Sequence, residues 1–297
     1  MTRVLLIVLL TACQLSFGYL KLKARVSSHL SNPASMTYDH EANCFYISNI
    51  NGNAEDENNS GFITRLAIDE KGKIHTEVII KGGELDTILN APKGIYYFRG
   101  QLFVADIDTL RIFTENSKGI WEAKRYIKIP GAQFLNDLVI DRRGVLWLTD
   151  AGANCLFDLR PPYGQRARRR FFHQKIIEPM GIELHPAADQ LWVTCLSEDI
   201  IYNIDIEKRK IINRYRTRIS GIAGIGSVEK GRVGVVDFAN RAYIASFAKD
   251  HVIRETVNRN FLQKPSSIIY EPVSGLFLVS ELKESAISIY VDENESK

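Results

Sequence analysis

The stretch Pro92-Lys93-Gly94-Ile95, followed after a short turn by Leu102-Phe103-Val104-Ala105-Asp106, carries the pattern on which the whole chain is built. The first phrase is a proline or aliphatic residue, a variable residue, a small or turn residue and an aliphatic residue. The second phrase is a β-rich run that ends on a polar side chain, and a third run follows at Leu110–Phe113. Short apolar runs separated by turn residues are typical of antiparallel strands. This stretch therefore predicts a small β-sheet.

The same pattern recurs along the chain at a spacing of about 45 residues. The other copies of the first phrase are Pro33–Met36, Leu135–Leu138, Pro179–Ile182, Ile219–Ile222 and Pro265–Ile268. The runs that follow them end at Asn49, Asp150, Cys195, Asp237 and Ser280. Each unit is a sheet too small to bury its own faces, and radial packing around one axis covers such sheets. We therefore predict an all-β fold, a six-bladed β-propeller.

The segment Leu20–Val26 is expected to close this ring. It alternates between apolar and polar residues with the period of a strand, and it precedes the first repeat. The last unit has no outer strand of its own, so we expect this N-terminal strand to join the last blade. The units account for residues 19–297, which predicts a single propeller domain.

Residues 1–18 have the features of a secretory signal peptide. Arg3 precedes the apolar run Val4–Leu10, and small residues follow before Tyr19. Cleavage before Tyr19 predicts a secreted or periplasmic protein. The alternative is a bacterial lipobox, in which the chain is cut before Cys13 and a lipid anchor is attached to that cysteine.

Composition excludes two classes of partner. The net charge of +3 lacks the basic excess of a dedicated nucleic-acid binder. No apolar run reaches the roughly 20 residues of a membrane-spanning helix, so we expect no membrane span. Beyond the predicted signal peptide, three cysteines remain, which allows at most one internal disulfide: Cys44, Cys155 and Cys195. Each lies in or beside an apolar run and is expected to be a small buried hydrophobic residue.

Three stretches of the sequence carry a family resemblance. Leu89–Gly94 with Leu102–Asp106 looks like a blade of the NHL type. Phe134–Asp137 with Leu146–Asp150 resembles the third blade of the regucalcin/gluconolactonase family, and Pro33–Asp39 resembles the opening of its secreted bacterial branch. The resemblance implies a divalent cation in the axial funnel that polarises a sugar-lactone carbonyl and activates water for ring opening.

The residues that the resemblance assigns to the metal are mostly replaced. The family's ligands are a Glu in the first blade, an Asn in the fourth and an Asp in the fifth, with an Asn in the third blade holding metal or substrate. These positions map to Ala34, Met180 and Ser220, and only the third-blade asparagine is kept, as Asn136. Calcium and magnesium require carboxylate and other oxygen ligands, so the replacements predict a degenerate metal site.

The second positions of the six phrases form a predicted ring at the axis: Ala34, Lys93, Asn136, Met180, Ser220 and Ser266. This ring has one cation and no carboxylate, which suits a neutral polar or anionic ligand held by hydrogen bonds. The candidate ligand-binding residues are Lys93, Asn136, Asp137, Ser220 and Ser266. Two alternatives are that Lys93 extends out of the funnel mouth and that Asp137 bonds only the backbone of its turn.

The aspartates that end the second strands are expected to accept backbone N–H bonds. The alternative is that Asp106 and Asp150 converge with Asn136 and rebuild a site for calcium or another divalent metal. Three functions therefore remain open: a cofactor-free propeller that binds a small polar molecule or a protein, a metal-dependent lactonase or esterase, and a pure protein-interaction scaffold. The basic run at Arg166–Arg170 is expected to be a solvated loop, with an anion-binding patch as the alternative.

Overall fold

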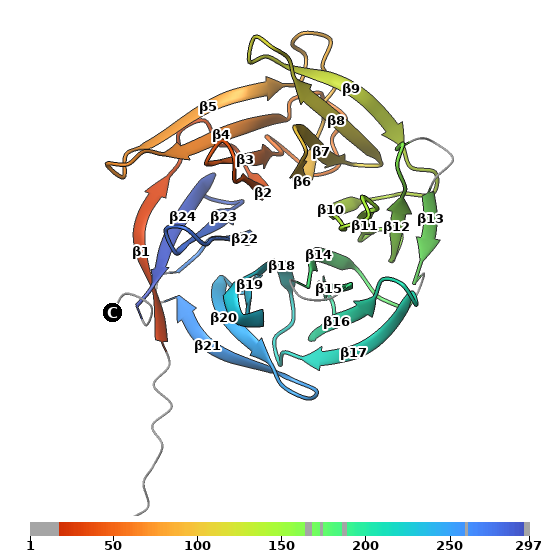
Figure 1. Ribbon diagram of the computed structural model, residues 1–297, viewed down its shortest axis with the longest axis vertical. Coiled ribbons are helices and arrows are strands. Elements are labelled where there is room, and N and C mark those ends of the chain that lie inside the picture. The colour runs from red at the N-terminus through yellow and green to blue at the C-terminus, as the bar shows by residue number, and fades with distance from the viewer. Residues whose placement is uncertain (1–17, 164–167, 173–174, 186–188, 259–260, 294–297) are drawn as a thin grey trace, which may run out of the picture.

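A ring of β-sheets surrounds a central axis in the computed structural model (Figure 1). The structure describes residues 18–163, 168–172, 175–185, 189–258 and 261–293. Residues 1–17, which hold Cys13 and nearly all of the predicted signal peptide, lie outside this part, as does Arg166. Within the described residues, no helix has the length and apolar character needed to cross a membrane.

Four of the sheets are four-stranded, and each runs antiparallel in chain order. Their strands are β2 (Pro33–Asp39), β3 (Cys44–Asn49), β4 (Phe62–Ile68), β5 (Ile74–Lys81), β6 (Pro92–Phe98), β7 (Gln101–Asp106), β8 (Thr109–Glu115) and β9 (Trp121–Lys128). The series continues with β10 (Leu135–Ile140), β11 (Leu146–Asp150), β12 (Cys155–Leu159), β13 (Arg168–Phe171), β14 (Pro179–Leu184), β15 (Gln190–Cys195), β16 (Ile200–Asp205) and β17 (Lys210–Arg216).

The fifth sheet is eight-stranded, in the order β18-β19-β20-β21-β1-β24-β23-β22. Its strands are β1 (Gly18–Val26), β18 (Ile222–Ser227), β19 (Val233–Asp237), β20 (Arg241–Phe247), β21 (Val252–Asn258), β22 (Pro265–Glu271), β23 (Leu276–Glu281) and β24 (Ala286–Asp292). The strand β1 pairs antiparallel with β24 and makes a short parallel pairing with β21. The N-terminal strand therefore joins the last strands of the chain, as its alternating pattern predicts.

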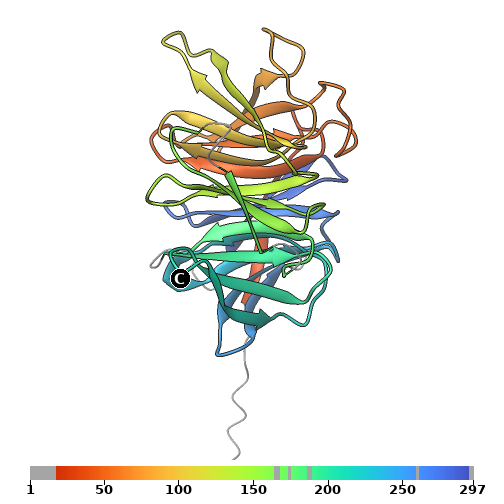
Figure 2. The same cartoon turned by 90° about the vertical axis from the view of Figure 1, so that its right-hand side faces the viewer.

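The innermost strands of the sheets are β2, β6, β10, β14, β18 and β22, and each contacts the next around the axis. The last of them, β22, contacts β2, so the ring is closed. Figure 2 shows the sheets from the side, stacked along the ring. The chain is thus an all-β propeller, and the first phrases of the repeats meet at its axis.

Large apolar side chains fill the spaces between neighbouring sheets. Trp147 and Trp192 are 1% exposed, and Phe103 and Phe277 are fully buried. They belong to clusters that join one sheet to the next, so they bind the sheets together. The three cysteines predicted to be buried are also buried in these cores, with free thiols: Cys44, Cys155 and Cys195.

Strand register corrects two positions of the repeat. In the fifth copy, Ile222 pairs with Asp237 as Pro92 pairs with Asp106, so the phrase is Ile222–Ile225 and not Ile219–Ile222. Both stretches have an aliphatic residue, a small residue, a glycine and an isoleucine, and only the pairing separates them. In the last copy, Pro265 pairs with Glu281, so the second strand ends one residue beyond Ser280.

The basic run is also corrected in part. Arg168–Phe171 is the outer strand β13, which pairs with β12, rather than a solvated loop. The alternation of apolar and polar residues that identifies other strands is missing from an arginine-rich edge. Its strand character comes from backbone pairing with β12, which the sequence pattern does not display.

Closure through β1 predicts a selective stability effect. Leu20 is 2% exposed and packs in the cluster that contains Phe277 and Tyr290, so Leu20→Ala is expected to lower the free energy of unfolding by about 3 kcal/mol. The neighbouring exposed Lys21→Ala is expected to change it by less than about 0.5 kcal/mol. Urea unfolding of both variants provides the measurement, and equal stabilities would contradict a role for β1 in closing the ring.

Candidate functional site

A cavity of about 370 Å³ lies where the inner strands begin. Every inner strand contributes to its wall, through Ala34 and Ser35, Lys93, Asn136 and Asp137, Met180, Ala223, and Ser266 and Ser267. The segments around the strand ends add Ile50, Ala54, Glu55, Phe134, Ala151, Gly152, Glu178, Leu196, Phe238, Lys264 and Leu282. The wall is mainly apolar, with a few polar groups, which is the usual composition of a small-molecule site.

Lys93 is the buried charge of this cavity. Its residue is 4% exposed, and its Nζ donates hydrogen bonds to the carbonyl oxygens of Ala54 at 3.0 Å and Ala91 at 3.3 Å. The Nζ also lies 4.2 Å from the centre of the Phe134 ring. Burial lowers the pKa of Lys93 to about 8, because the desolvation of the ammonium outweighs the attraction of nearby carboxylates. The alternative in which Lys93 extends out of the funnel into solvent is therefore wrong.

Asn136 faces the same cavity with its hydrogen-bonding groups available. It lines the wall, and its side-chain amide has no hydrogen-bond partner among the residues that the structure describes. An amide offers two N–H donors and one carbonyl acceptor, so Asn136 can both donate to a ligand and accept from it. Ser266 differs, because its hydroxyl is bonded to the carbonyl oxygens of Pro33 and Ala34 and to Ser280.

Asp137 on β10 and Glu183 on the neighbouring strand β14 are two acidic residues that interact electrostatically. The Asp137 carboxylate accepts the backbone N–H of Leu138 at 2.9 Å and of Ile182 at 3.2 Å. Burial raises the pKa of Asp137 to about 7 despite these bonds. Burial also raises the pKa of Glu183 to about 7, and the charge of Asp137 adds to the effect. Asp137 therefore lines the cavity and bonds backbone at the same time.

Ser220 is a correction to the predicted site. It is exposed, it lies before β18, and it is absent from the cavity wall, because the corrected phrase places Ala223 at the equivalent position. The ring of second positions is accordingly Ala34, Lys93, Asn136, Met180, Ala223 and Ser266. This ring is more apolar than the sequence predicts, and Lys93 and Asn136 are its main polar groups.

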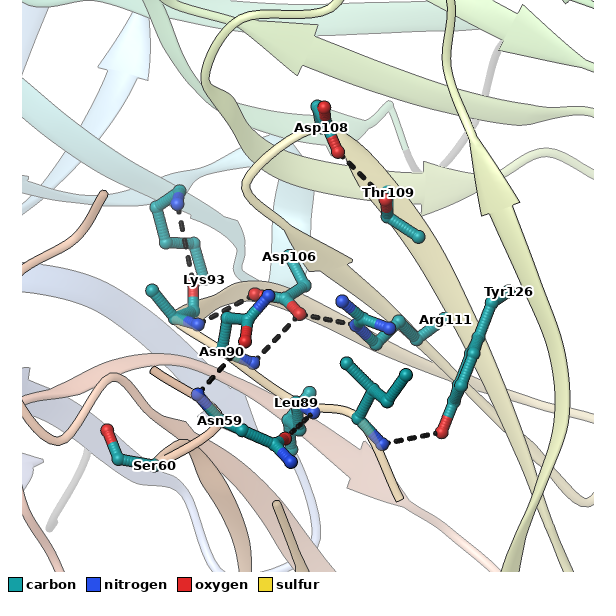
Figure 3. Close-up of polar contacts among 12 residues, drawn as sticks. Asn59, Ser60, Leu89, Asn90, Lys93, Asp106, Asp108, Thr109, Arg111 and Tyr126 are labelled. Carbon is teal, nitrogen blue, oxygen red and sulfur yellow. Dashed lines mark hydrogen bonds and ion pairs between the residues drawn. The ribbon is translucent and has the colours of Figure 1, made fainter. Parts of the chain in front are cut away.

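The carboxylates of Asp106 and Asp150 accept hydrogen bonds from the backbone. Figure 3 shows the Asp106 carboxylate accepting the N–H groups of Asn90 and Ala91, at 2.9 and 2.7 Å, and the Nε–H of Arg111. Asp150 similarly accepts three backbone N–H groups, those of Gln133, Phe134 and Ala153, at distances from 2.8 to 3.0 Å. Neither aspartate lines the cavity, so the structure does not bring them together with Asn136 there.

The donors in this cavity do not fit a calcium centre. Calcium takes six to eight oxygen ligands with carboxylates among them, whereas the ring of second positions offers one free amide, a hydroxyl already bonded to backbone and a buried ammonium. Of the carboxylates in the wall, Asp137 accepts N–H groups and Glu178 accepts the Ser197 hydroxyl. Within the described ranges, no group of three His, Cys, Asp or Glu side chains is placed to hold a metal ion. Asp106 and Asp150, which the rebuilt metal site requires, have their oxygens committed to N–H donors.

Several cavity residues escape the sequence pattern. Glu55, Glu178 and Lys264 come from connecting segments, and Phe134 and Phe238 supply aromatic faces. Glu178 and Lys264 each directly precede an inner strand, as Phe134 does. The residue just before each repeated phrase could therefore have been predicted to lie at the cavity. Glu55 lies in the long connection after β3, where nothing in the repeat predicts a position at the axis.

The fold is similar to solved structures of two lyases. A streptogramin B lyase matches with a TM-score of 0.65 and 13% identity, over 93% of this chain and 98% of that one. Virginiamycin B lyase from Staphylococcus aureus matches with a TM-score of 0.58 and 15% identity, over 92% of this chain and 99% of that one. No family model matches the sequence, and no curated protein matches it. At such identities the likeness shows a shared β-propeller fold, and the regucalcin/gluconolactonase family remains a resemblance.

The structural role of Asp106 can be separated from a role in binding. Asp106→Asn replaces one accepting oxygen with an N–H₂ group and removes the charge opposite the buried Arg111, so we expect a loss of about 3 kcal/mol of stability. Asp108→Asn is the matched control, because Asp108 is partly exposed and its carboxylate bonds the side chains of Thr109 and Lys128. Its expected cost is below about 1 kcal/mol. Thermal and urea unfolding give both values, and an Asp106→Asn protein as stable as the wild type would sink the structural role.

The pKa of Lys93 predicts a pH-dependent effect on stability. Between pH 8 and 10.5 the unfolded chain keeps the lysine proton that the folded protein has lost, so this group makes the wild type more stable as pH rises. Lys93→Met lacks that rise. The stability of the variant relative to the wild type should therefore fall by about 2–3 kcal/mol from pH 7 to pH 10. Chemical denaturation at several pH values tests this, with exposed Lys264→Met as control; parallel pH profiles for Lys93→Met and the wild type would contradict it.

Proposed function

We propose that this chain is a six-bladed propeller whose axial cavity binds a small organic molecule with an apolar body and a neutral polar head. The observation that carries the proposal is that one cavity, with a mainly apolar wall, is lined by both the open amide of Asn136 and the buried ammonium of Lys93. The six blades are the four four-stranded sheets and the two halves of the eight-stranded sheet, β18–β21 and β22–β24 with β1.

The apolar part of the ligand has a defined place in this proposal. Met180, Leu196 and Ala223 line one part of the cavity, and the rings of Phe134 and Phe238 add aromatic surface. Burial of a flat or branched apolar group against them is favourable by about 25 cal/mol for each Å² removed from water. Polar sugars gain little from such a wall, so we propose an aromatic or aliphatic body for the ligand.

The polar head is selected by charge. The Lys93 ammonium lies under the influence of the carboxylates of Asp106, Asp150 and Glu55, in that order. A further carboxylate on the ligand would be repelled by these groups, whereas a neutral carbonyl accepts an N–H from Lys93 or Asn136 without that cost. We therefore propose an amide, ester or ketone oxygen as the head.

The predicted alternatives rank below this function. A metal-dependent lactonase or esterase needs oxygen ligands that the ring of second positions lacks. The solved structures with this fold include lyases named for streptogramin B and virginiamycin B, which supports a small molecule as the ligand of such a propeller rather than a protein alone. With the signal-peptide features of residues 1–18, we propose a secreted or periplasmic binding protein.

The binding proposal is tested with benzamide, which has an aromatic body and a neutral amide head. Benzamide is expected to bind the purified protein more tightly than benzoate, which differs by its charge. Asn136→Ala should weaken benzamide binding by about fivefold to tenfold, the worth of one hydrogen bond. Isothermal titration and ligand-observed NMR give the affinities, and Asn213→Ala on the outer strand β17 is the control that should bind as the wild type does.

Two results would contradict the proposal. Absence of benzamide binding at millimolar concentration would remove the aromatic carbonyl ligand class. Tighter binding of benzoate would show that the cavity selects an anion, with Lys93 and Lys264 as the dominant charges. Full benzamide affinity after treatment with a chelator is expected, and a loss of affinity that calcium restores would favour the metal-dependent alternative.

A further inference from the structure

We propose that Lys93 forms an imine with an aldehyde or ketone that enters the axial cavity. This inference rests on the proposed function, because it takes the carbonyl head of the ligand as the group that Lys93 meets. It adds covalent chemistry to binding, and it assigns that chemistry to one side chain at the start of β6.

The hydrogen bonds of Lys93 suit a neutral amine as well as an ammonium. A neutral amine has two N–H donors and one lone pair. The carbonyl oxygens of Ala54 and Ala91 accept two N–H groups of Lys93, at 3.0 and 3.3 Å. No third acceptor among the described residues bonds the nitrogen, so the remaining position can carry the lone pair. The two carbonyls and the Phe134 ring, whose centre lies 4.2 Å from Nζ, thus hold the nitrogen at the cavity wall.

The surroundings of Lys93 favour loss of its proton. The residue is 4% exposed, it is packed against the Phe134 ring, and burial lowers its pKa to about 8. At pH 7 about a tenth of such an amine is neutral, a few hundred times the neutral fraction of a solvated lysine. A desolvated lysine of this kind is an activated nucleophile for carbonyl groups.

The reaction balances without any redox partner. The neutral Lys93 nitrogen attacks the carbonyl carbon, a C–N bond forms, and the carbonyl oxygen takes up the proton lost by nitrogen to give a carbinolamine. The C–O bond then breaks, the oxygen leaves as water with the second proton of the nitrogen, and the electron pair of that N–H bond forms the C=N bond to the ligand. Water is the sole by-product, and its attack on the imine reverses the reaction.

Glu55, an exposed residue of the cavity wall, is the candidate for exchanging the protons of these steps. It lines the cavity, directly follows Ala54, and its charge acts on Lys93. Its carboxylate has no hydrogen-bond partner in the described ranges, unlike Glu178, which accepts the Ser197 hydroxyl, and Asp137, which accepts backbone N–H groups. A free carboxylate can take the proton of the ammonium and return it to the departing oxygen.

The test traps the imine in the wild-type protein, so it needs no variant that must fold. The protein is incubated with benzaldehyde and cyanoborohydride at pH 7, and peptide mass mapping locates the benzyl groups. Lys93 should be labelled at least about tenfold faster than the exposed Lys264 on the cavity rim. The labelling rate of Lys93 should level off above pH 8, because the neutral fraction of its amine then approaches its limit.

Matched variants and a competitor complete the experiment. Lys93→Arg should lose the fast label while Lys210→Arg, on the outer strand β17, retains it, and Glu55→Gln should slow labelling of Lys93 without changing that of Lys264. Benzamide should protect Lys93. An unlabelled Lys93, or one labelled no faster than Lys264, would overturn the imine. Benzamide binding without labelling would leave the proposed function intact, whereas labelling without benzamide binding would support the imine and remove the proposed ligand class.

Discussion

The close approach of backbones at the axis is the constraint on which the rest of the structure depends. A Cβ on Gly94 would lie 2.6 Å from the Cα of Asp137, and one on Gly224 would lie 2.6 Å from the carbonyl oxygen of Ser266. No side chain fits there, so the third position of the repeated phrase must be small wherever a neighbouring strand lies this close. A hydroxyl also stabilises the contact between neighbouring sheets at the axis. The Thr149 hydroxyl accepts the N–H of Asp137 and donates to the carbonyl oxygen of Met180 on the next sheet.

Asp137 shows what this constraint does to a polar residue. It occupies the position that is glycine or serine in every other copy, at the crowded junction of β10 and β14. Its carboxylate remains near the axis, away from bulk water. The hydrogen bond from the N–H of Ile182 is the main interaction that offsets its lost hydration. Desolvation prevails over that bond and raises the pKa of Asp137 to about 7. The tight ring therefore sets the charge state of the cavity as well as its shape.

The sequence predicts the repeated strands and the residues that share the axis, because the phrase couples a turn to a strand of fixed length. Lys93, Asn136 and Asp137 all lie in the cavity for that reason. The prediction fails where two candidate phrases, Ile219–Ile222 and Ile222–Ile225, overlap. The pairing of Ile222 with Asp237 selects the second phrase, so the prediction that Ser220 lines the cavity is wrong. Glu55 escapes prediction for a different reason: it is brought to the axis by a long connection whose path depends on tertiary contacts rather than on local pattern.

The buried charges explain why the chemistry of this cavity concentrates on one lysine. The carboxylates of Asp106 and Asp150 accept backbone N–H groups of the segments that enter β6 and β10, so their oxygens are already hydrogen-bonded. They still act on Lys93 through the low-dielectric interior, where charges are poorly screened. Their attraction keeps the ammonium from losing its proton entirely, and desolvation keeps that proton weakly held. The aspartates that stabilise the ring thereby leave Lys93 with a pKa close to neutral pH, the range in which an amine can both donate a hydrogen bond and act as a nucleophile.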